Sequence, residues 1–178
     1  MIILIGASAS GKSTIEKELV EIGYKNIISY TSRPIRENEK NHRDYHFISE
    51  KEFISFKMLN FFAESTIYNS WHYGIALEDL KPESIAVVEP YGFRQLLKKS
   101  KINNFDIISF FIDAPERIRL IRMINRGDNL MEAFRRIFSD QGVFQGVQEE
   151  TTYIVNNDRP LQETIDEIDS KLKFLRRK

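Results

Sequence analysis

The stretch "MIILIGASASGKST", residues 1–14, decides how the fold begins. Its apolar run from Ile2 to Ile5 is short and continuous, which predicts a buried strand. The residues that follow, Gly6 to Ser13, match the pattern G-x-x-x-x-G-K-[ST] in full. Apolar residues at helical spacing then predict a helix from Lys12 to Ile22, with Gly23 as its stop. The stretch therefore predicts a strand, a loop of small residues and a helix in succession.

This succession is the context in which such a loop binds phosphate. Small residues allow backbone N–H groups to turn inward onto phosphate oxygens, as the N-terminus of a helix also does. Lys12 then reaches the β- and γ-phosphates, and the Ser13 hydroxyl is a ligand for Mg²⁺. The alternative is a plain strand-to-helix turn with an incidental lysine, which the flanking elements disfavour. The predicted triphosphate site consists of Gly6, Ala7, Ser8, Ala9, Ser10, Gly11, Lys12, Ser13 and Thr14.

Length and composition limit the other possibilities. A chain of 178 residues suits one domain with a sizeable core. Acidic and basic residues balance at 26 each, so no global field attracts nucleic acid or a membrane surface. The absence of cysteine excludes disulfides and thiolate metal sites. Because no apolar run has the length of a membrane span or the form of a signal peptide, we expect a cytoplasmic protein with neither nucleic acid nor membrane as a partner.

Short apolar strands alternate with helices along most of the chain. Further strands are expected at residues 26–30, 45–48, 84–89, 106–112 and 152–155. We interpret Pro90-Tyr91-Gly92 as the end of one strand, followed by a helix through Leu97. Other helices are expected over residues 115–125, 129–144 and 160–175. This alternation predicts an α/β fold with a parallel sheet covered on both faces.

Residues 31–73 interrupt this rhythm. Residues 31–43 are polar and are expected to form a loop. Ser49 and Glu52 have the spacing of a capping box, which predicts the start of a short helix. Residues 61–73 are rich in aromatics without helical spacing, and we interpret them as paired, antiparallel short strands. The region therefore reads as an insertion over the carboxyl edge of the sheet, where ligands bind in such folds.

The polar loop "YTSRPIRENEKNHRDYHF", residues 30–47, contains a candidate phosphate clamp. Arg33 and Arg36 flank Pro34, so two guanidinium groups sit on a stiffened turn. The Tyr45 hydroxyl adds a hydrogen-bond donor nearby. A solvated charged loop is the alternative interpretation for a run of this kind.

Several motifs in order make the chain similar to a known family. "SYTSRPIRENEKNHRDYHFIS" and then "FFAESTIYNSWHYG" resemble the sequence pattern of the guanylate kinase family. In this chain the arginine-proline element reads Arg33-Pro34-Ile35-Arg36, with the spacing of the arginines kept. The resemblance continues through "VVEPYG" at residues 87–92, "DAPERIRLIRMINRG" at residues 113–127, Arg136 and "VNND" at residues 155–158. It covers essentially the whole chain.

The resemblance implies a fold, an activity and an organisation. The fold is a P-loop NTPase-type parallel five-stranded sheet flanked by helices, with a small mixed α/β insertion and a helical lid. The activity is transfer of the γ-phosphoryl group of ATP to GMP, and also to dGMP, with Mg²⁺. One domain is expected, in a monomer or homodimer. Its parts are a core (residues 1–30, 81–121 and 146–178), a monophosphate-binding insertion (31–80) and a lid (122–145).

The resemblance also assigns residues to the acceptor nucleotide. Ser29 and Glu64 are expected to read the guanine edge, because a carboxylate accepts from both N1–H and N2–H. Adenine lacks that donor pair and leaves Glu64 unpaired. Glu39 is expected to orient an arginine, and Glu89 to organise the Mg²⁺ water shell or the nucleoside. The residues expected to hold the GMP phosphate are Arg33, Arg36, Tyr45 and Tyr73.

Basic residues of the lid are expected to act on the transferred phosphoryl group. Arg122 and Arg126 lie one helical turn apart, so one face presents both. Together with Lys12 and Arg136 they are the predicted catalytic residues, since phosphoryl transfer needs positive charge and exclusion of water. Asn156 is placed by the resemblance at the adenine. A solvated face is the alternative for the arginines of this helix, Arg119 included.

Departures from the family pattern keep two alternatives open. The position after Tyr73-Gly74 is Ile75, where the family usually has Ser or Thr, and Val87 stands where it often has Asp. With the bulky Trp71, these residues motivate a nucleoside monophosphate kinase of shifted base preference. The second alternative is a non-catalytic guanylate kinase-like binding module, against which the intact Lys12 and Ser13 argue.

Overall fold

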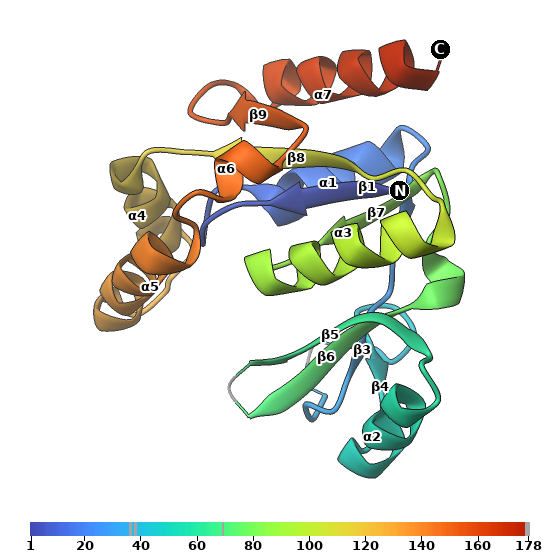
Figure 1. Cartoon of the computed structure of the whole chain (residues 1–178). Helices are drawn as coiled ribbons and strands as arrows, with labels where there is room; N and C mark the ends of the chain where they lie inside the picture. Colours follow the sequence, from blue (N-terminus) through green and yellow to red (C-terminus); the bar gives the residue numbers. More distant parts are fainter. Residues whose placement is uncertain (36, 38, 69, 177–178) are drawn as a thin grey trace. The chain divides into compact units, whose positions relative to one another are not determined.

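The structure, a computed structural model, describes residues 1–35, 37, 39–68 and 70–176 (Figure 1). It contains a five-stranded parallel sheet of order β2-β7-β1-β8-β9 and a mixed four-stranded sheet of order β4-β3-β6-β5. The first sheet consists of β1 (Ile2–Ile5), β2 (Lys25–Asn26), β7 (Ser84–Val87), β8 (Ile108–Asp113) and β9 (Tyr153–Asn156). The second consists of β3 (Tyr30–Thr31), β4 (His46–Phe47), β5 (Phe62–Tyr68) and β6 (Trp71–Ala76). The fold class expected from the sequence is confirmed.

The helices are α1 (Lys12–Glu21), α2 (Glu50–Met58), α3 (Pro90–Asn103), α4 (Glu116–Asn125), α5 (Leu130–Val143), α6 (Val147–Glu150) and α7 (Leu161–Arg176), with a 3-10 turn η1 (Leu77–Asp79). Among the described residues, no helix combines the length and the apolar character needed to cross a bilayer.

The chain divides into two compact units. The first holds Met1, Lys25–Ser84 and Tyr91–Ile107, and the second holds Ile2–Tyr24, Ile85–Pro90 and Ile108–Lys178. The expected insertion, residues 31–80, falls wholly within the first unit. The expected lid, residues 122–145, falls within the second unit together with the glycine loop. The roles of these segments in binding remain predictions.

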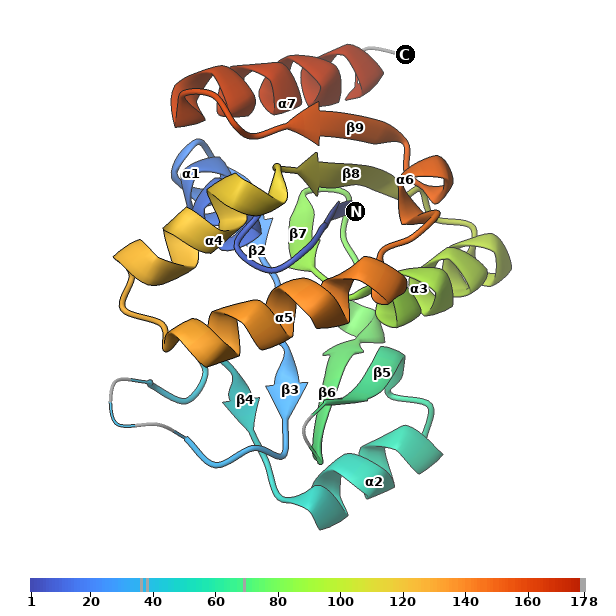
Figure 2. The same cartoon turned by 90° about the vertical axis from the view of Figure 1, so that its left-hand side faces the viewer.

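The second unit is built around the buried strand β1. All four residues of β1 are buried, because the strand pairs in parallel with β7 on one side and β8 on the other. Helices α1 and α7 pack against each other, and α7 runs beside β9 (Figure 2). Their apolar faces share one core with the strands, made of Ile2, Leu4, Ile15, Leu19, Tyr24, Ile85, Phe110, Ile112, Val155, Ile165, Ile168 and Leu172. This core fixes the ends of β1 and α1, and therefore the loop between them.

The first unit has an aromatic core. Phe53 of α2 stacks on Phe62 of β5 with ring centroids 4.3 Å apart, and on His72 of β6 at 5.0 Å. Tyr30 meets Phe61 edge-on at 5.2 Å. A side chain at Gly74 would come within 2.9 Å of the Phe62 ring, so the close approach of β6 requires glycine there. A few large rings thus supply the core of a four-stranded sheet with little apolar area of its own.

Most elements expected from the sequence are confirmed, and two expectations are wrong. The single strand expected at residues 26–30 is two short strands, β2 and β3, which belong to different sheets. The apolar pattern of this segment did not reveal that the chain changes sheets. Pro90 does not end the preceding strand before a separate helix, since α3 begins at Pro90 itself and runs to Asn103. Proline suits the first helical position, where its missing N–H is not needed.

The expected capping box is present at the start of α2. The Ser49 hydroxyl accepts from the Glu52 N–H at 3.2 Å, and the Glu52 carboxylate accepts from the Ser49 N–H at 2.8 Å. We predict that Ser49→Ala lowers the free energy of unfolding by about 1 kcal/mol in urea titrations. Ser55→Ala on the same helix is the control, because that exposed hydroxyl only donates to the Lys51 carbonyl. Equal effects of the two substitutions would contradict a capping contribution.

Candidate nucleotide-binding site

The loop between β1 and α1 has a backbone that small residues permit. Gly6 and Gly11 have φ angles of +155° and +104°. A side chain at Gly6 would collide with the Ile112 carbonyl, and one at Gly11 with the Asn157 amide. Ala9 has φ +59°, a left-handed conformation that an alanine rarely adopts. The loop is therefore tightly enclosed, and its glycines are required by space as well as by conformation.

Lys12 folds back over the loop. Its ammonium group donates to the Gly6 carbonyl at 2.6 Å and to the Ala7 carbonyl at 2.9 Å. Desolvation lowers the pKa of Lys12, while the nearby Glu89 and Asp140 carboxylates raise it. The positive charge is thus kept within the loop that is predicted to bind the phosphates.

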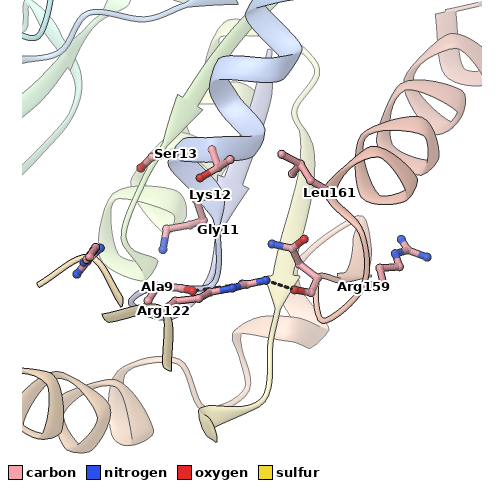
Figure 3. Close-up of a pocket in the computed structure, with 10 residues that line it drawn as sticks. Ala9, Gly11, Lys12, Ser13, Arg122, Arg159 and Leu161 are labelled. Atoms are coloured by element: carbon pink, nitrogen blue, oxygen red, sulfur yellow. Dashed lines mark hydrogen bonds between the residues drawn. The ribbon is translucent and has the colours of Figure 1, made fainter. Parts of the chain in front are cut away.

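A cavity of about 440 Å³ opens beside the loop (Figure 3). It is lined by Ala9, Gly11, Lys12, Ser13, Thr14, Arg122, Arg126, Asn157, Arg159 and Leu161. The structure therefore brings residues of the predicted triphosphate loop together with two of the predicted lid arginines. Asn156, predicted at the adenine, does not line this cavity.

Arg122 and Asn157 together hold the loop at Ser10. Arg122 donates to the Ser10 carbonyl at 3.1 Å and to the Asn157 carbonyl at 2.6 Å. The buried Asn157 amide donates to the same Ser10 carbonyl at 2.7 Å and accepts from Thr164 at 3.1 Å. The neighbouring Asn156 is exposed, and its side chain accepts from the Asp158 N–H. Sequence reasoning missed Asn157, because its burial depends on packing against a loop 147 residues away.

Arg126 and Arg136 lie near acidic partners, which are Asp128 between α4 and α5 and Glu132 in the first turn of α5. Arg126 Nε donates to Asp128 at 2.7 Å. Arg136 Nε donates to Glu132 at 2.9 Å, and its NH1 lies 3.9 Å from Asp128. Hydrogen bonds from Arg135 and Arg136 lower the pKa of Glu132 below its usual value, and the hydrogen bond from Arg126 lowers the pKa of Asp128. The two arginines therefore have local partners that compensate their charge.

In the first unit, the predicted phosphate-clamp residues lie around Arg33. This buried guanidinium group makes two parallel hydrogen bonds to Glu39, at 3.0 and 2.7 Å. It lies 5.6 Å from the ring centre of Tyr45, whose ring is 6.0 Å from that of Tyr73. The bond to Glu39 raises the pKa of Arg33, and Tyr73 adds a smaller contribution. Arg36 lies outside the described residues.

Glu64, predicted to read guanine, is a buried carboxylate. It is 6% exposed, and among the described residues no donor reaches its Oε2 atom. Burial raises the pKa of Glu64 to about 7. A side chain at Gly92 would come within 2.8 Å of the same oxygen, so glycine leaves room for the carboxylate. A buried acceptor without a donor is costly, which singles out this position as a candidate ligand contact.

The two other predicted acceptor residues belong to different units of the chain. Ser29 is partly buried, and its carbonyl accepts from the His46 N–H at 2.9 Å. Glu89 belongs to the second unit, unlike the rest of the predicted GMP set. Neighbouring protein atoms partly desolvate this carboxyl and raise its pKa, and the Lys12 ammonium opposes the rise. Its position is thus next to the glycine loop.

The family model described as guanylate kinase matches residues 1–174. The chain belongs to the guanylate kinase family. Among curated relatives, a guanylate kinase of Mycoplasma mobile is 34% identical over 147 residues, which are 76% of this chain and 73% of that protein. A guanylate kinase of Mycoplasmopsis pulmonis is 35% identical over 143 residues, or 74% of this chain and 73% of that one. The resemblance inferred from the motifs is confirmed.

Solved structures support the fold alone. The crystal structure of guanylate kinase from Anaplasma phagocytophilum superposes with a TM-score of 0.76 at 20% identity, covering all of this chain and 86% of that one. A gluconokinase from Sinorhizobium meliloti 1021 gives a TM-score of 0.58 at 18% identity, covering 98% and 91% of the two chains. The chain therefore shares its fold with these two solved structures.

The raised pKa of Glu64 predicts a pH-dependent effect of Glu64→Gln on stability. A carboxyl whose pKa is higher in the folded state holds its proton more tightly there, so its destabilising effect grows as pH rises from about 4.5 to about 7. We predict that Glu64→Gln raises the free energy of unfolding by roughly 2 kcal/mol at pH 8 and by much less at pH 5. Urea titrations at both pH values test this.

The exposed Glu21→Gln is the control for that measurement. A gain in stability that is the same at pH 5 and pH 8 would show that the Glu64 carboxyl is not buried as a titrating group.

Proposed function

We propose that this chain transfers the γ-phosphoryl group of ATP to GMP, giving ADP and GDP. Family membership over residues 1–174, with an intact glycine loop, is the observation that carries this proposal. The family supports this activity over the alternatives of a shifted base preference or a non-catalytic module. dGMP is proposed as a second acceptor, because it shares with GMP the base and the phosphate that the proposed residues contact.

The donor side is proposed to lie in the cavity beside the loop. Backbone N–H groups of residues 6–14 and the Lys12 ammonium group bind the phosphates of ATP. Arg122 holds the far side of the loop and faces the same cavity. Asn156 was expected at the adenine. We propose instead that the adenine contacts Asn157, Arg159 and Leu161, since these residues line the cavity and Asn156 does not.

Mg²⁺ is implied by the family, and the donor set fits it. Ser13 presents a hard hydroxyl oxygen at the first turn of α1 and lines the cavity with Lys12. Mg²⁺ binds proteins through one or two oxygen ligands and keeps its remaining contacts to water and phosphate. When bound with ATP, the ion neutralises phosphate charge. Ser13 is the proposed ligand, and Glu89 is proposed to accept hydrogen bonds from the ion's water shell.

The acceptor side is proposed to lie in the first unit. Arg33, oriented by its two bonds to Glu39, binds the GMP phosphate with the Tyr45 and Tyr73 hydroxyls. Arg36 is proposed to assist, as the sequence predicts. Glu64 in its ionised form, with Ser29, accepts from the guanine N1–H and N2–H.

Catalysis is proposed to rest on position and charge. A phosphate oxygen of GMP is already an adequate nucleophile, so no general base is needed. Lys12, Arg122, Arg126 and Arg136 stabilise the charge that spreads over the transferred group. Arg126 and Arg136 exchange their present carboxylate partners for the nucleotide phosphates. Water is excluded as a competing acceptor when these groups enclose the substrates.

The acceptor base decides between this proposal and a shifted preference. We predict ADP production from Mg·ATP with GMP and dGMP, and none above background with AMP, CMP, UMP or dTMP. The physical reason is the paired donor edge of guanine, which alone satisfies an ionised Glu64. Lys12→Ala is the control for a contaminating kinase, with an expected fall in kcat of about 100-fold. Turnover of another base would reject the guanine assignment, and no turnover despite ATP binding would favour a binding module.

The pair of bonds between Arg33 and Glu39 predicts a selective effect on GMP. Glu39→Gln leaves Arg33 with a neutral partner that cannot hold it in a bidentate arrangement. We predict that the KM for GMP rises about tenfold, which corresponds to about 1.4 kcal/mol, while the KM for ATP stays within twofold. Steady-state kinetics with each substrate varied in turn measures this, with the exposed Glu21→Gln as control. An equal rise in both KM values would show a general disturbance of the fold.

A further inference from the structure

Ser8 of the glycine loop is held by two charged side chains from the α4–α5 pair. The Ser8 N–H donates to Asp140 Oδ2 at 2.8 Å, and its hydroxyl donates to Oδ1 of the same carboxylate at 3.2 Å. The Ser8 carbonyl accepts from Arg119 NH1 at 3.3 Å. Arg119 lies on α4 and Asp140 on α5. All three polar groups of Ser8 are therefore engaged by one pair of residues.

Arg119 and Asp140 also bind each other in a buried place. Arg119 NH1 donates to Asp140 Oδ2 at 2.8 Å, and the two side chains are 6% and 12% exposed. The alternative of a solvated face is therefore wrong for Arg119. A buried ion pair gains little stability over apolar residues of similar volume, because desolvation of both charges offsets their attraction. A contribution to stability is therefore a weak explanation for the presence of this buried ion pair.

A second set of contacts holds the same loop two residues further along the chain. Arg122 and Asn157 hold the Ser10 carbonyl, and Arg119 and Asp140 hold Ser8. Ala9 lies between these two fixed residues and has the loop's rare left-handed φ of +59° for a residue with a side chain. Such conformations persist only where the surroundings enforce them. We expect loss of either support to allow Ala9 to relax and to reorient the N–H groups that follow it.

We propose that Asp140 and Arg119 are positioning residues, which fix Ser8 so that the glycine loop keeps the conformation that binds nucleotide phosphates. The two residues act through the loop backbone and touch neither substrate. The inference rests on the proposed function in one respect, the binding of nucleotide phosphates by this loop. It also couples the end of α5 to the loop, since Asp140 lies in the last turn of that helix.

The test separates positioning from stability by removing both charges together. Arg119→Met with Asp140→Ala leaves no unpaired buried charge, so we expect its thermal midpoint to stay near that of the wild type. Titration calorimetry with ADP and, separately, with GMP gives the readout. We expect the dissociation constant for ADP to rise about tenfold and that for GMP to stay within twofold. A contribution to stability alone predicts wild-type ADP binding in this double variant.

A conservative variant and a matched control complete the design. Asp140→Asn keeps an oxygen that accepts from the Ser8 N–H, so we expect it to bind ADP more tightly than Asp140→Ala does. Gln141→Ala removes the neighbouring contact between the helices, in which Gln141 donates to Glu116 at 3.2 Å, and is expected to leave ADP binding unchanged. ADP binding by the double variant within twofold of wild type overturns the proposal, as does an equal loss in Gln141→Ala.

The wild-type chain distinguishes failure of this inference from failure of the proposed function. If it binds ADP but phosphorylates no monophosphate, the proposed activity is rejected and the positioning role is still decided by the variants. If it does not bind ADP, both proposals are overturned.

Discussion

The backbone conformation of the glycine loop is the constraint on which the second unit depends. Three residues with positive φ lie between β1 and α1, at Gly6, Ala9 and Gly11. Contacts from outside the loop are therefore needed to maintain its backbone conformation. Carbonyl groups of the loop accept hydrogen bonds from Lys12, Arg122 and Asn157, and Ser8 is hydrogen-bonded to the side-chain pair of α4 and α5. The buried core under β1 and α1 fixes the two ends. Groups from α4, α5 and Asn157, together with Lys12 of the loop itself, thus converge on the residues that are proposed to bind phosphate.

The first unit is different because it buries charged side chains away from water. Its stacked rings around Phe53 and Phe62 give a small sheet enough apolar area to stay folded. On that support, Arg33 is buried with a bidentate partner, whereas no donor among the described residues reaches Oε2 of the buried Glu64. Glu39 compensates the charge of Arg33 within the protein and fixes the position of its guanidinium group. The Glu64 carboxylate keeps a buried oxygen without a donor from the described residues, which costs stability and is the reason that Glu64 is proposed to contact a ligand.

The sequence predicted what local patterns determine. The glycine loop, the capping box at Ser49 and the buried strands follow from spacing alone, and the order of motifs led to the family. The strand expected at residues 26–30 failed because an apolar run does not say which sheet it joins. Asn157 and the Arg119–Asp140 pair were missed because their burial arises from contacts between distant segments. A charged residue on a helix usually faces water, and nothing in the neighbouring sequence marked these two as exceptions.

Because burial raises the pKa of Glu64, ligand binding at this carboxyl depends on the proton activity of the solution. A carboxyl with a pKa of about 7 is half protonated in neutral solution. If guanine is held by the ionised form, each molecule bound releases about half a proton at that pH. The heat of association then depends on the ionisation enthalpy of the buffer, and capture of the acceptor weakens as the medium becomes acidic. A side chain that is proposed to discriminate between bases would therefore also make the protein respond to acidity.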